Sequence, residues 1–231
     1  MTLHIGIVAC SAEGAALCYQ TICAEGEALL GPHAHPEVSM HTPSFADYMV
    51  YLDEDDQRGV AELMLLSAGK LAAAGADFLI CPDNTIHQAL PRVEPRSPLP
   101  WLHIAEVVAK EAARRGFRRL GLTGTRWLVE SHVYPDKLDA QGLEWLRPEA
   151  PDREAIHRII MEELVKGESK PESTAFFQRV IGRLKDKDCD AVVLGCTEIP
   201  LIINDSNSSL PCLDSTRLLA RAALRLAVEN N

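Results

Sequence analysis

Apolar residues along this chain fall into two kinds of segment. Short apolar runs that end in small or polar residues predict buried strands at residues 5–10, 37–41, 78–81 and 119–123 and within residues 188–198. Longer stretches with apolar residues at helical spacing predict helices at residues 13–30, 53–74, 104–115, 152–166, 172–185 and 214–229. Between the second strand and the second helix, a loop is expected to carry Pro43 and Asp47.

Two of these strands occur in segments that look like copies of each other. GADFLICPDNT (75–85) and DCDAVVLGCTE (188–198) both lead from a polar start through an apolar strand into a polar turn. Aligning Asp77 with Asp190, an offset of 190 − 77 = 113, places Asp83 on Cys196. The strands at 5–10 and 119–125 match at nearly the same offset, 120 − 5 = 115. Such spacing indicates an internal duplication, although two short apolar strands can also match by chance.

The repeated order of strands and helices predicts an α/β protein of two pseudo-symmetric domains, each a mostly parallel sheet flanked by helices. We expect residues 1–99 with 212–231 to form one domain and residues 100–211 the other. Ligands of open parallel sheets bind at the carboxyl ends of the strands. Polar side chains gather at those ends, and would meet in a cleft if the halves pack face to face: Cys10 and Ser11, Asp83 to Thr85, Thr123 to Thr125, and Cys196 to Glu198.

The thiol of Cys196 is the strongest chemical candidate at these ends. Gly195 before it allows a close backbone approach, and the amides of Thr197 and Glu198 can begin a helix and hold an anion. A thiol at a helix N-terminus has a lowered pKa and is a usable base or nucleophile. The alternative is that Cys196 only packs, as Cys18, Cys81 and Cys189 are expected to do.

Composition and charge exclude several classes of function. The chain has 231 residues, an apolar fraction of 47% and a formal net charge of −10 without a basic stripe, which argues against nucleic-acid binding and favours a small ligand. Seven cysteines, odd in number and without CxxC pairs, favour a reducing cytoplasm. Neither a signal-peptide pattern nor a run of ~20 apolar residues occurs, so export and membrane insertion are not expected. The eight histidines lack HxxH or HExxH spacing, and GxGxxG and Walker patterns are absent, so we expect neither a metal nor a nucleotide cofactor.

Two motifs together resemble those of the aspartate/glutamate racemase superfamily. LGCTEIPL (194–201) is similar to its second active-site motif, and PDNTIH (82–87) to its first, which usually reads PCNTxH. The similarity extends to GADF (75–78) and DSTRLLA (214–220), and so over essentially the whole chain. It implies a two-domain, pseudo-symmetric homodimer with its active site between the domains, which racemises acidic amino acids without cofactor or metal by using two cysteines on opposite faces of the α-carbon.

Carried over by position, the resemblance makes Cys196 the second catalytic base and puts Asp83 in the place of the first. His87 follows the core of the first motif and Glu198 that of the second, and the resemblance makes both of them supports for the acid/base groups. The residues expected to bind substrate are Ser11, Tyr48, Asn84, Thr85, Thr125, Lys166, Thr197 and Glu198. Each of these polar residues can also serve as an ordinary turn or cap residue.

The sequence departs from the family pattern at two places. At the first, an ordinary Asp has a pKa of about 3.9 against about 8.5 for Cys, so an exposed Asp83 is a weak base. Burial beside a substrate carboxylate would raise the pKa of Asp83. The alternative is that Asp83 only caps the following turn. Tyr48 stands where related aspartate racemases often carry an Arg for the side-chain carboxylate, and Tyr donates one hydrogen bond without charge. Lys166 matches a lysine that can contact that carboxylate, or is a solvated residue at a helix end.

The unequal pair Asp83 and Cys196 leaves three functions to distinguish. The first is a cofactor-independent racemase with direction-dependent kinetics. The second is a one-thiol isomerase or decarboxylase of the same superfamily. The third is a non-catalytic protein that binds amino acids or other small carboxylates and has lost one base.

Overall fold

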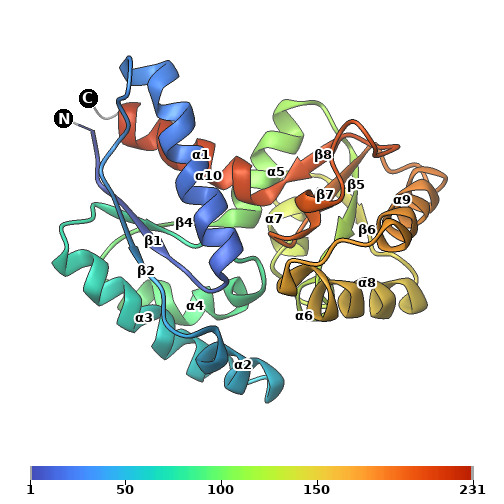
Figure 1. Cartoon of the computed structure of the whole chain (residues 1–231), viewed down its shortest axis with the longest axis horizontal. Coiled ribbons are helices and arrows are strands. Elements are labelled where there is room, and N and C mark those ends of the chain that lie inside the picture. The colour runs from blue at the N-terminus through green and yellow to red at the C-terminus, as the bar shows by residue number, and fades with distance from the viewer. Residues whose placement is uncertain (1, 230–231) are drawn as a thin grey trace. The chain divides into compact units, whose positions relative to one another are not determined.

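A computed structural model describes residues 2–229. These residues divide into two compact units. One takes in the chain up to Ile104 together with the segment from Thr216 onward, and the other is Ala105–Ser215. Each unit is a sheet flanked by helices (Figure 1). No helix among residues 2–229 is long and apolar enough to cross a bilayer.

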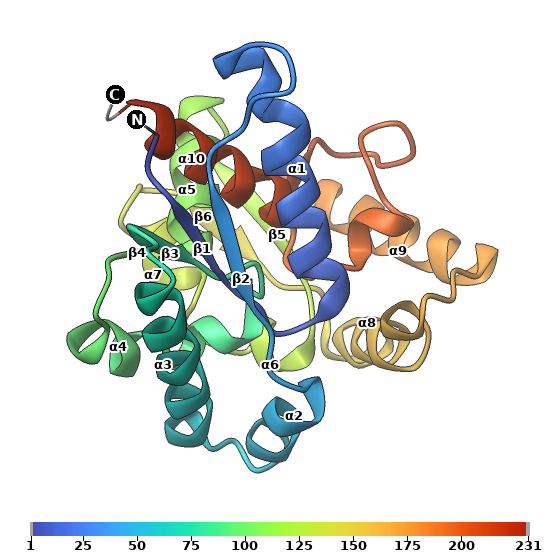
Figure 2. The ribbon, with the colours of Figure 1, turned by 60° about the vertical axis from the view of Figure 1, so that its left-hand side comes forward.

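The first unit is built on a four-stranded parallel sheet in the order β2-β1-β3-β4. Its strands are β1 (Ile5–Val8), β2 (Val38–His41), β3 (Phe78–Ile80) and β4 (Trp101–Leu102). The two central strands, β1 and β3, are buried along their whole length, because helices cover both faces of the sheet. Figure 2 shows α1 (Ala12–Leu30) and α3 (Gln57–Ala73) on opposite sides of β1 and β2.

Local signals set the ends of these helices. Ser11 precedes α1, and its Oγ accepts a hydrogen bond from the Gly14 amide at 3.4 Å. The α3 helix starts at Gln57, later than the predicted residue 53, because the Asp56 carboxylate accepts the amides of Arg58 and Gly59, each at 3.0 Å. Gly75 follows the end of α3 with a φ of 93°, a conformation that favours glycine.

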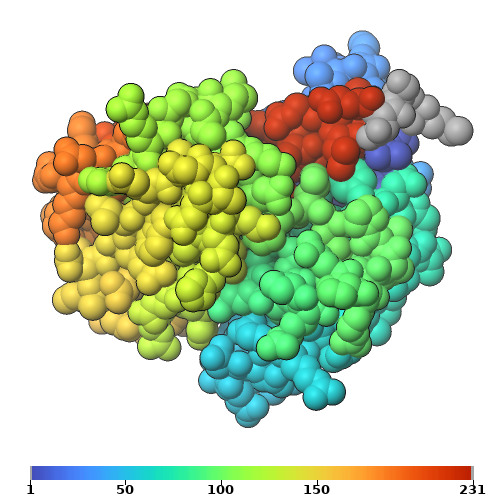
Figure 3. All heavy atoms as spheres, turned by 180° about the vertical axis from the view of Figure 1, so that it is seen from behind, coloured from blue at the N-terminus to red at the C-terminus, as the bar shows by residue number. Residues whose placement is uncertain are grey.

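The predicted loop is confirmed at Pro43 and wrong at Asp47, because residues Phe45–Asp53 form a helix, α2. Its buried Tyr48 and Leu52 lie one turn apart and pack into the core that α2 shares with α3. The remaining elements of this unit are α4 (Leu90–Val93), α10 (Ser215–Glu229) and two 3-10 turns, η1 (Thr85–Ala89) and η2 (Glu94–Arg96). Figure 3 shows the surface of the segment that connects β3 to α5, in green.

The second unit repeats the sheet of the first, with parallel strands in the order β6-β5-β7-β8. Its strands are β5 (Arg119–Thr123), β6 (Glu144–Leu146), β7 (Ala191–Leu194) and β8 (Cys212–Asp214). The equal strand order supports the duplication expected from the sequence, with β1 and β3 equivalent to β5 and β7.

Helices of the second unit largely follow the predicted ones. They are α5 (Ile104–Arg114), α6 (Arg126–Val129), α7 (Pro135–Asp139), α8 (Ala150–Glu162) and α9 (Pro171–Lys185), with 3-10 turns η3 (Leu164–Lys166) and η4 (Ile199–Leu201). The helix predicted at 152–166 ends early, so Lys166 belongs to η3, and Gly167 with a φ of 75° ends that turn.

Candidate active site

A thiol and a carboxylate are in direct contact in the turn that follows β7. The Sγ of Cys196 donates a hydrogen bond to Oε2 of Glu198 at 2.8 Å. Glu198 is only 2% exposed, whereas Cys196 is partly exposed. The thiol therefore has a proton acceptor at hand inside the protein while it remains accessible itself, which suits an acid/base or nucleophilic role.

Close backbone packing holds this turn in place. A Cβ on Gly195 would lie 2.6 Å from the carbonyl oxygen of Thr123, and the Gly195 amide donates to that oxygen at 2.9 Å. Gly124, next along β5, has a φ of 157° and packs against the Gly195 carbonyl. Gly195 therefore packs against the backbone of β5, and the two glycines fix the position of Cys196 in the turn.

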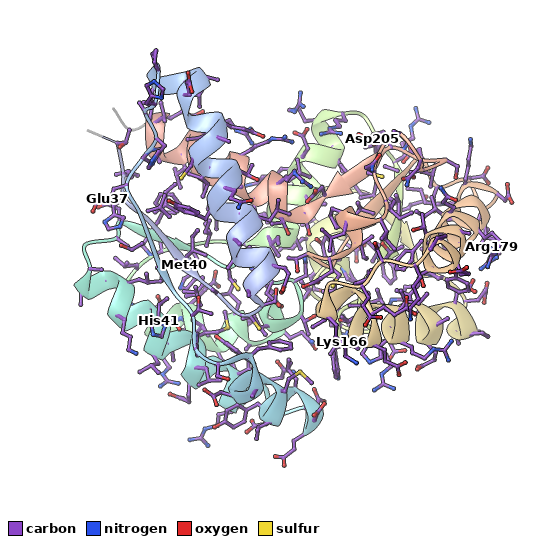
Figure 4. The ribbon with its side chains drawn as sticks, viewed as in Figure 1. Glu37, Met40, His41, Lys166, Arg179 and Asp205 are labelled. Atoms are coloured by element: carbon purple, nitrogen blue, oxygen red, sulfur yellow. The ribbon has the colours of Figure 1, made fainter. Side chains whose placement is uncertain are left out.

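Other expected residues of the second unit lie around this turn or apart from it. Thr197 is buried next to Cys196, and the Oγ1 of the buried Thr125 accepts the Leu128 amide at 3.3 Å as the cap of α6. Lys166 lies at the end of η3, on a different segment (Figure 4). Its side chain forms no ion pair with any residue that the structure describes.

Asp83 occupies the equivalent place after β3 in the first unit. Its Oδ1 accepts the Ile86 amide at 3.1 Å, so the carboxylate caps the η1 turn, and the residue is half-buried. Asn84, Thr85 and Ser11 are buried at the same ends of β3 and β1. The capping role expected as the alternative is therefore present, and it occupies one carboxylate oxygen of a residue that is still partly exposed.

His87 connects the Asp83 turn to the start of α5. Its Nε2 accepts the Ile104 amide at 3.2 Å, so Nδ1 carries the proton and donates to the Asp83 carbonyl at 2.7 Å. The ring also packs against His103, with centroids 4.9 Å apart. His87 contacts the backbone of Asp83, so it orients the turn that carries the carboxylate.

Tyr48 lies deep in the same unit, with 0% of its surface exposed. Its hydroxyl has no hydrogen-bond partner among residues 2–229. Burial raises its pKa far above the ordinary value, and nearby Cys81, Cys10 and Asp83 raise it further. The Ser67 hydroxyl lowers the pKa in part, but it already donates to the Leu63 carbonyl at 3.1 Å. Tyr48 is thus a neutral hydroxyl close to Asp83.

A polar chain behind Tyr48 was not foreseen from the sequence. Lys70 Nζ donates to His41 Nε2 at 2.9 Å, and His41 Nδ1 lies 2.9 Å from the Ser67 hydroxyl. Figure 4 shows His41 at the end of β2. Burial and the Lys70 charge lower the His41 pKa, so the ring is held neutral. His41 belongs to β2, whereas Ser67 and Lys70 belong to α3, so no spacing along the sequence predicts this polar chain.

Four of the other six cysteines pack in the interior, and Cys10 and Cys23 remain. None of the seven forms a disulfide bond. Burial raises the pKa of Cys81 well above its ordinary value, and it raises those of Cys189 and Cys212 to about 11. These thiols stay protonated and pack, as does the fully buried Cys18. Cys10, just after β1, is also buried, and Cys23 in α1 is partly exposed. No group of three potential metal ligands is found in the described part of the chain.

Comparisons with known proteins agree with the motifs. A model of the Asp/Glu/hydantoin racemase family matches residues 6–223. The broad specificity amino-acid racemase RacX of Bacillus subtilis is 24% identical over 186 residues, covering 80% of this chain and 78% of its own. A glutamate racemase of Thermus thermophilus is 32% identical over 162 residues, covering 68% of this chain and 58% of its own.

Solved structures give the same result over the full length. A proposed Asp/Glu racemase from Yersinia pestis has a TM-score of 0.90 and 31% identity, covering 98% of this chain and 99% of its own. An aspartate racemase homologue from Pyrococcus horikoshii has a TM-score of 0.84 and 27% identity, with the same coverage. The matched sequence and the two parallel sheets are thus those of one family: the chain belongs to the Asp/Glu/hydantoin racemases and is an enzyme of the amino-acid racemase type.

Proposed function

We propose that this enzyme racemises an amino acid with an acidic side chain, aspartate or glutamate, without a cofactor, and that Cys196 is one of its acid/base groups. The observation that carries the proposal is the contact between the Cys196 thiol and the buried Glu198 carboxylate at 2.8 Å. Glu198 accepts the thiol proton, and the resulting thiolate removes the proton from the substrate α-carbon. The carbanion is then protonated on its opposite face.

Asp83 is the proposed partner at that opposite face. It occupies the position equivalent to Cys196 in the duplicated sequence and is partly exposed. One carboxylate oxygen is engaged by the Ile86 amide, which favours the ionised form of the group. A carboxylate opposite a thiol makes the two directions of the reaction unequal, because matched bases are what make racemisation even-handed.

Polar groups at the strand ends are proposed to hold the substrate. Buried hydroxyl and amide groups suited to the α-carboxylate belong to Ser11, Asn84, Thr85, Thr125 and Thr197. Lys166, without an ion pair in the described structure, is the proposed cation for the side-chain carboxylate. Tyr48 can add one hydrogen bond from its neutral hydroxyl.

The domain division, the compartment and the oligomeric state are also proposed. We propose that the two units act as the two domains of the enzyme, and their bounds differ by a few residues from the expected 1–99 with 212–231 and 100–211. Seven free thiols fit a reducing cytoplasm. A homodimer is proposed from the family resemblance, and light scattering coupled to gel filtration tests it against the monomer mass of 25.4 kDa.

Chiral chromatography of single enantiomers tests the proposed reaction. L- and D-aspartate and L- and D-glutamate are incubated separately with the enzyme, with Cys196→Ser and with Cys212→Ser as the control for a packing thiol. We expect the opposite enantiomer to appear with the wild type and with Cys212→Ser and to be absent with Cys196→Ser. Undiminished turnover by Cys196→Ser would rule out thiol chemistry. Maleate and an arylmalonate in the same assay distinguish a one-thiol isomerase or decarboxylase.

A further inference from the structure

Cys10 and Asp83 follow two neighbouring strands, β1 and β3, at the same end of the sheet. The parallel register joins Ile5 to Phe78, Gly6 to Leu79 and Ile7 to Ile80, a constant offset of 73. Cys10 and Asp83 are separated by the same offset, each a few residues past the end of its strand. Neighbouring strands of a sheet lie about 4.8 Å apart, so side chains on one face at such positions are neighbours.

The side chains of Cys10 and Cys81 lie on the same side of the sheet. Val8 and Leu79 belong to the apolar cluster that includes α3, together with Cys10 and Cys81 two residues further along the chain from each. Asp83 follows two residues after Cys81, and it raises the pKa of the same buried Tyr48 as Cys10 and Cys81 do. Cys10 is 2% exposed, and Asp83 is the more exposed of the two.

The hydroxyl of Tyr48 is a second, independent sign of a polar site here. This side chain is wholly buried in the same cluster, close enough to Cys10, Cys81 and Asp83 for their charges to act on it, and its hydroxyl has no hydrogen-bond partner among the described residues. A buried donor without a partner costs about 1–3 kcal/mol unless a bound group satisfies it. A carboxyl or carboxylate arriving at this end of the sheet would do so.

The Cys10 thiol and the Asp83 carboxyl group differ in whether they ordinarily hold a proton at neutral pH. A thiol has an ordinary pKa of about 8.5 and holds its proton at neutral pH, whereas a carboxyl group with an ordinary pKa of about 3.9 has lost it. Two ionisable groups in contact titrate as a pair, and a carboxylate raises the pKa of a neighbouring thiol. Cys81 shares this environment, but its pKa is raised well above the ordinary value by burial, Asp83 and Cys18.

We propose that Cys10 and Asp83 act as one proton-sharing pair, with Cys10 as the thiol that returns the proton to the substrate α-carbon on the face opposite Cys196. This inference rests on the proposed racemisation. Cys196 thiolate takes the α-proton and becomes a thiol, and the carbanion takes the proton of the Cys10 thiol, which leaves a thiolate beside the Asp83 carboxylate. The enzyme returns to its starting state when Cys196 releases its proton to water through Glu198 and the pair takes one proton from water, or when the reverse reaction with the opposite enantiomer moves both protons back. The missing thiol of the first motif is thus supplied by the neighbouring strand.

Separate measurement of exchange and inversion tests the pair. Each enantiomer is incubated in deuterated water with the wild type, Cys10→Ala, Asp83→Asn and Cys212→Ala, the control for a packing thiol away from Asp83. Deuterium at the α-carbon and chirality are followed by NMR and chiral chromatography. We expect Cys10→Ala to keep exchange from the enantiomer that Cys196 deprotonates while its inversion falls at least ~100-fold, the lower bound for loss of a general acid. Asp83→Asn should lose less inversion than Cys10→Ala, and Cys212→Ala should resemble the wild type. Abolished inversion in Asp83→Asn with intact inversion in Cys10→Ala would overturn the inference and leave Asp83 as the sole acid.

A titration that needs no turnover separates this inference from the proposed function. The enzyme is labelled with ¹³Cβ-cysteine, the Cys10 signal is assigned from Cys10→Ser, and its shift is followed with pH in the wild type and in Asp83→Asn. Loss of the neighbouring negative charge should move the titration midpoint of Cys10 to lower pH by about one unit or more. An unmoved midpoint would show that the two groups do not share a proton. If the wild type exchanges no amino acid, the proposed function fails, and this titration still decides whether the pair exists.

Discussion

The Cys196 thiol donates its hydrogen to the Glu198 carboxylate at 2.8 Å, within the turn after β7. Glu198 is buried, so its carboxylate is screened from water and acts chiefly on the thiol. In the proposed reaction, this contact makes Glu198 the base for the thiol, two residues after it in the same turn.

Substituting Glu198→Gln should therefore impair catalysis more than binding. Gln keeps the size of the side chain but accepts no proton, so the thiolate forms less readily. We expect kcat to fall by about 10²-fold, within the range for loss of a general base, with KM changed little. Steady-state kinetics with the better enantiomer measures this, and an unchanged kcat would remove Glu198 from the proton path.

Gly195→Ala should destabilise the enzyme. The new Cβ would lie 2.6 Å from the Thr123 carbonyl oxygen and 2.7 Å from Leu128 Cδ2, so the turn must shift, at a cost of about 1–3 kcal/mol. Gly182→Ala in α9 is the matched control, because its Cβ meets nothing within 4 Å and it should stabilise the helix by about 0.5–1 kcal/mol. Urea unfolding compares the two, and equal stabilities would contradict the packing described for Gly195.

His87→Ala tests the link between the Asp83 turn and α5. Its removal leaves the Asp83 carbonyl and the Ile104 amide without the ring nitrogens that bind them. We expect a loss of about 1–3 kcal/mol in the free energy of unfolding. His132→Ala is the control, because the His132 side chain is 87% exposed and its removal should change stability little. A similar small effect for both variants would show that His87 does not hold the turn.

Glu111 gives a pH dependence of stability. Hydrogen bonds from Arg114, together with Arg115, lower its pKa from 4.5 to about 2 in the folded enzyme. The unfolded chain binds the proton more readily, so the stabilisation is complete above pH 4.5 and is lost as the pH falls toward 2. Glu111→Gln should cost up to about 1 kcal/mol at pH 7, where the surface position limits the gain, and clearly less at pH 3.

Urea unfolding at both pH values measures the difference between wild type and Glu111→Gln. Glu27→Gln on α1 is the control, because Glu27 is exposed and forms no ion pair in the described structure. A cost for Glu111→Gln that stays constant from pH 7 to pH 3 would contradict the lowered pKa of Glu111.

The sequence was informative where an element is long and regularly patterned. The strands that end at Asp83 and Cys196, and the helices with repeated apolar spacing, follow from local pattern alone. By contrast α2 was missed because Pro43 and Asp47 indicate a turn, whereas the helix is stabilised by packing of Tyr48 and Leu52 against α3. Strands as short as β4 and β6 carry too few residues for alternation to be recognised.

In the candidate site too, the residues within a motif could be found from the sequence, whereas contacts between distant segments could not. The turns that carry Asp83 and Cys196 were located from motif and duplication, because both residues directly follow their strands. The proposed pairing of Cys10 with Asp83 depends on the β1 to β3 register. The chain from Lys70 through His41 to Ser67 depends on how α3 packs on β2. Such contacts join residues far apart in the sequence, so spacing along the chain does not reveal them.

The central claim is that Cys196 exchanges protons with the substrate α-carbon. Incorporation of α-deuterium from deuterated water into L- and D-aspartate and into L- and D-glutamate, followed by NMR at equal enzyme concentrations, tests it most directly. The wild type should exchange both enantiomers of at least one substrate at unequal rates, and Cys196→Ser should lose the exchange of the faster one. Absence of exchange from all four substrates, or exchange that persists in Cys196→Ser, would contradict the claim.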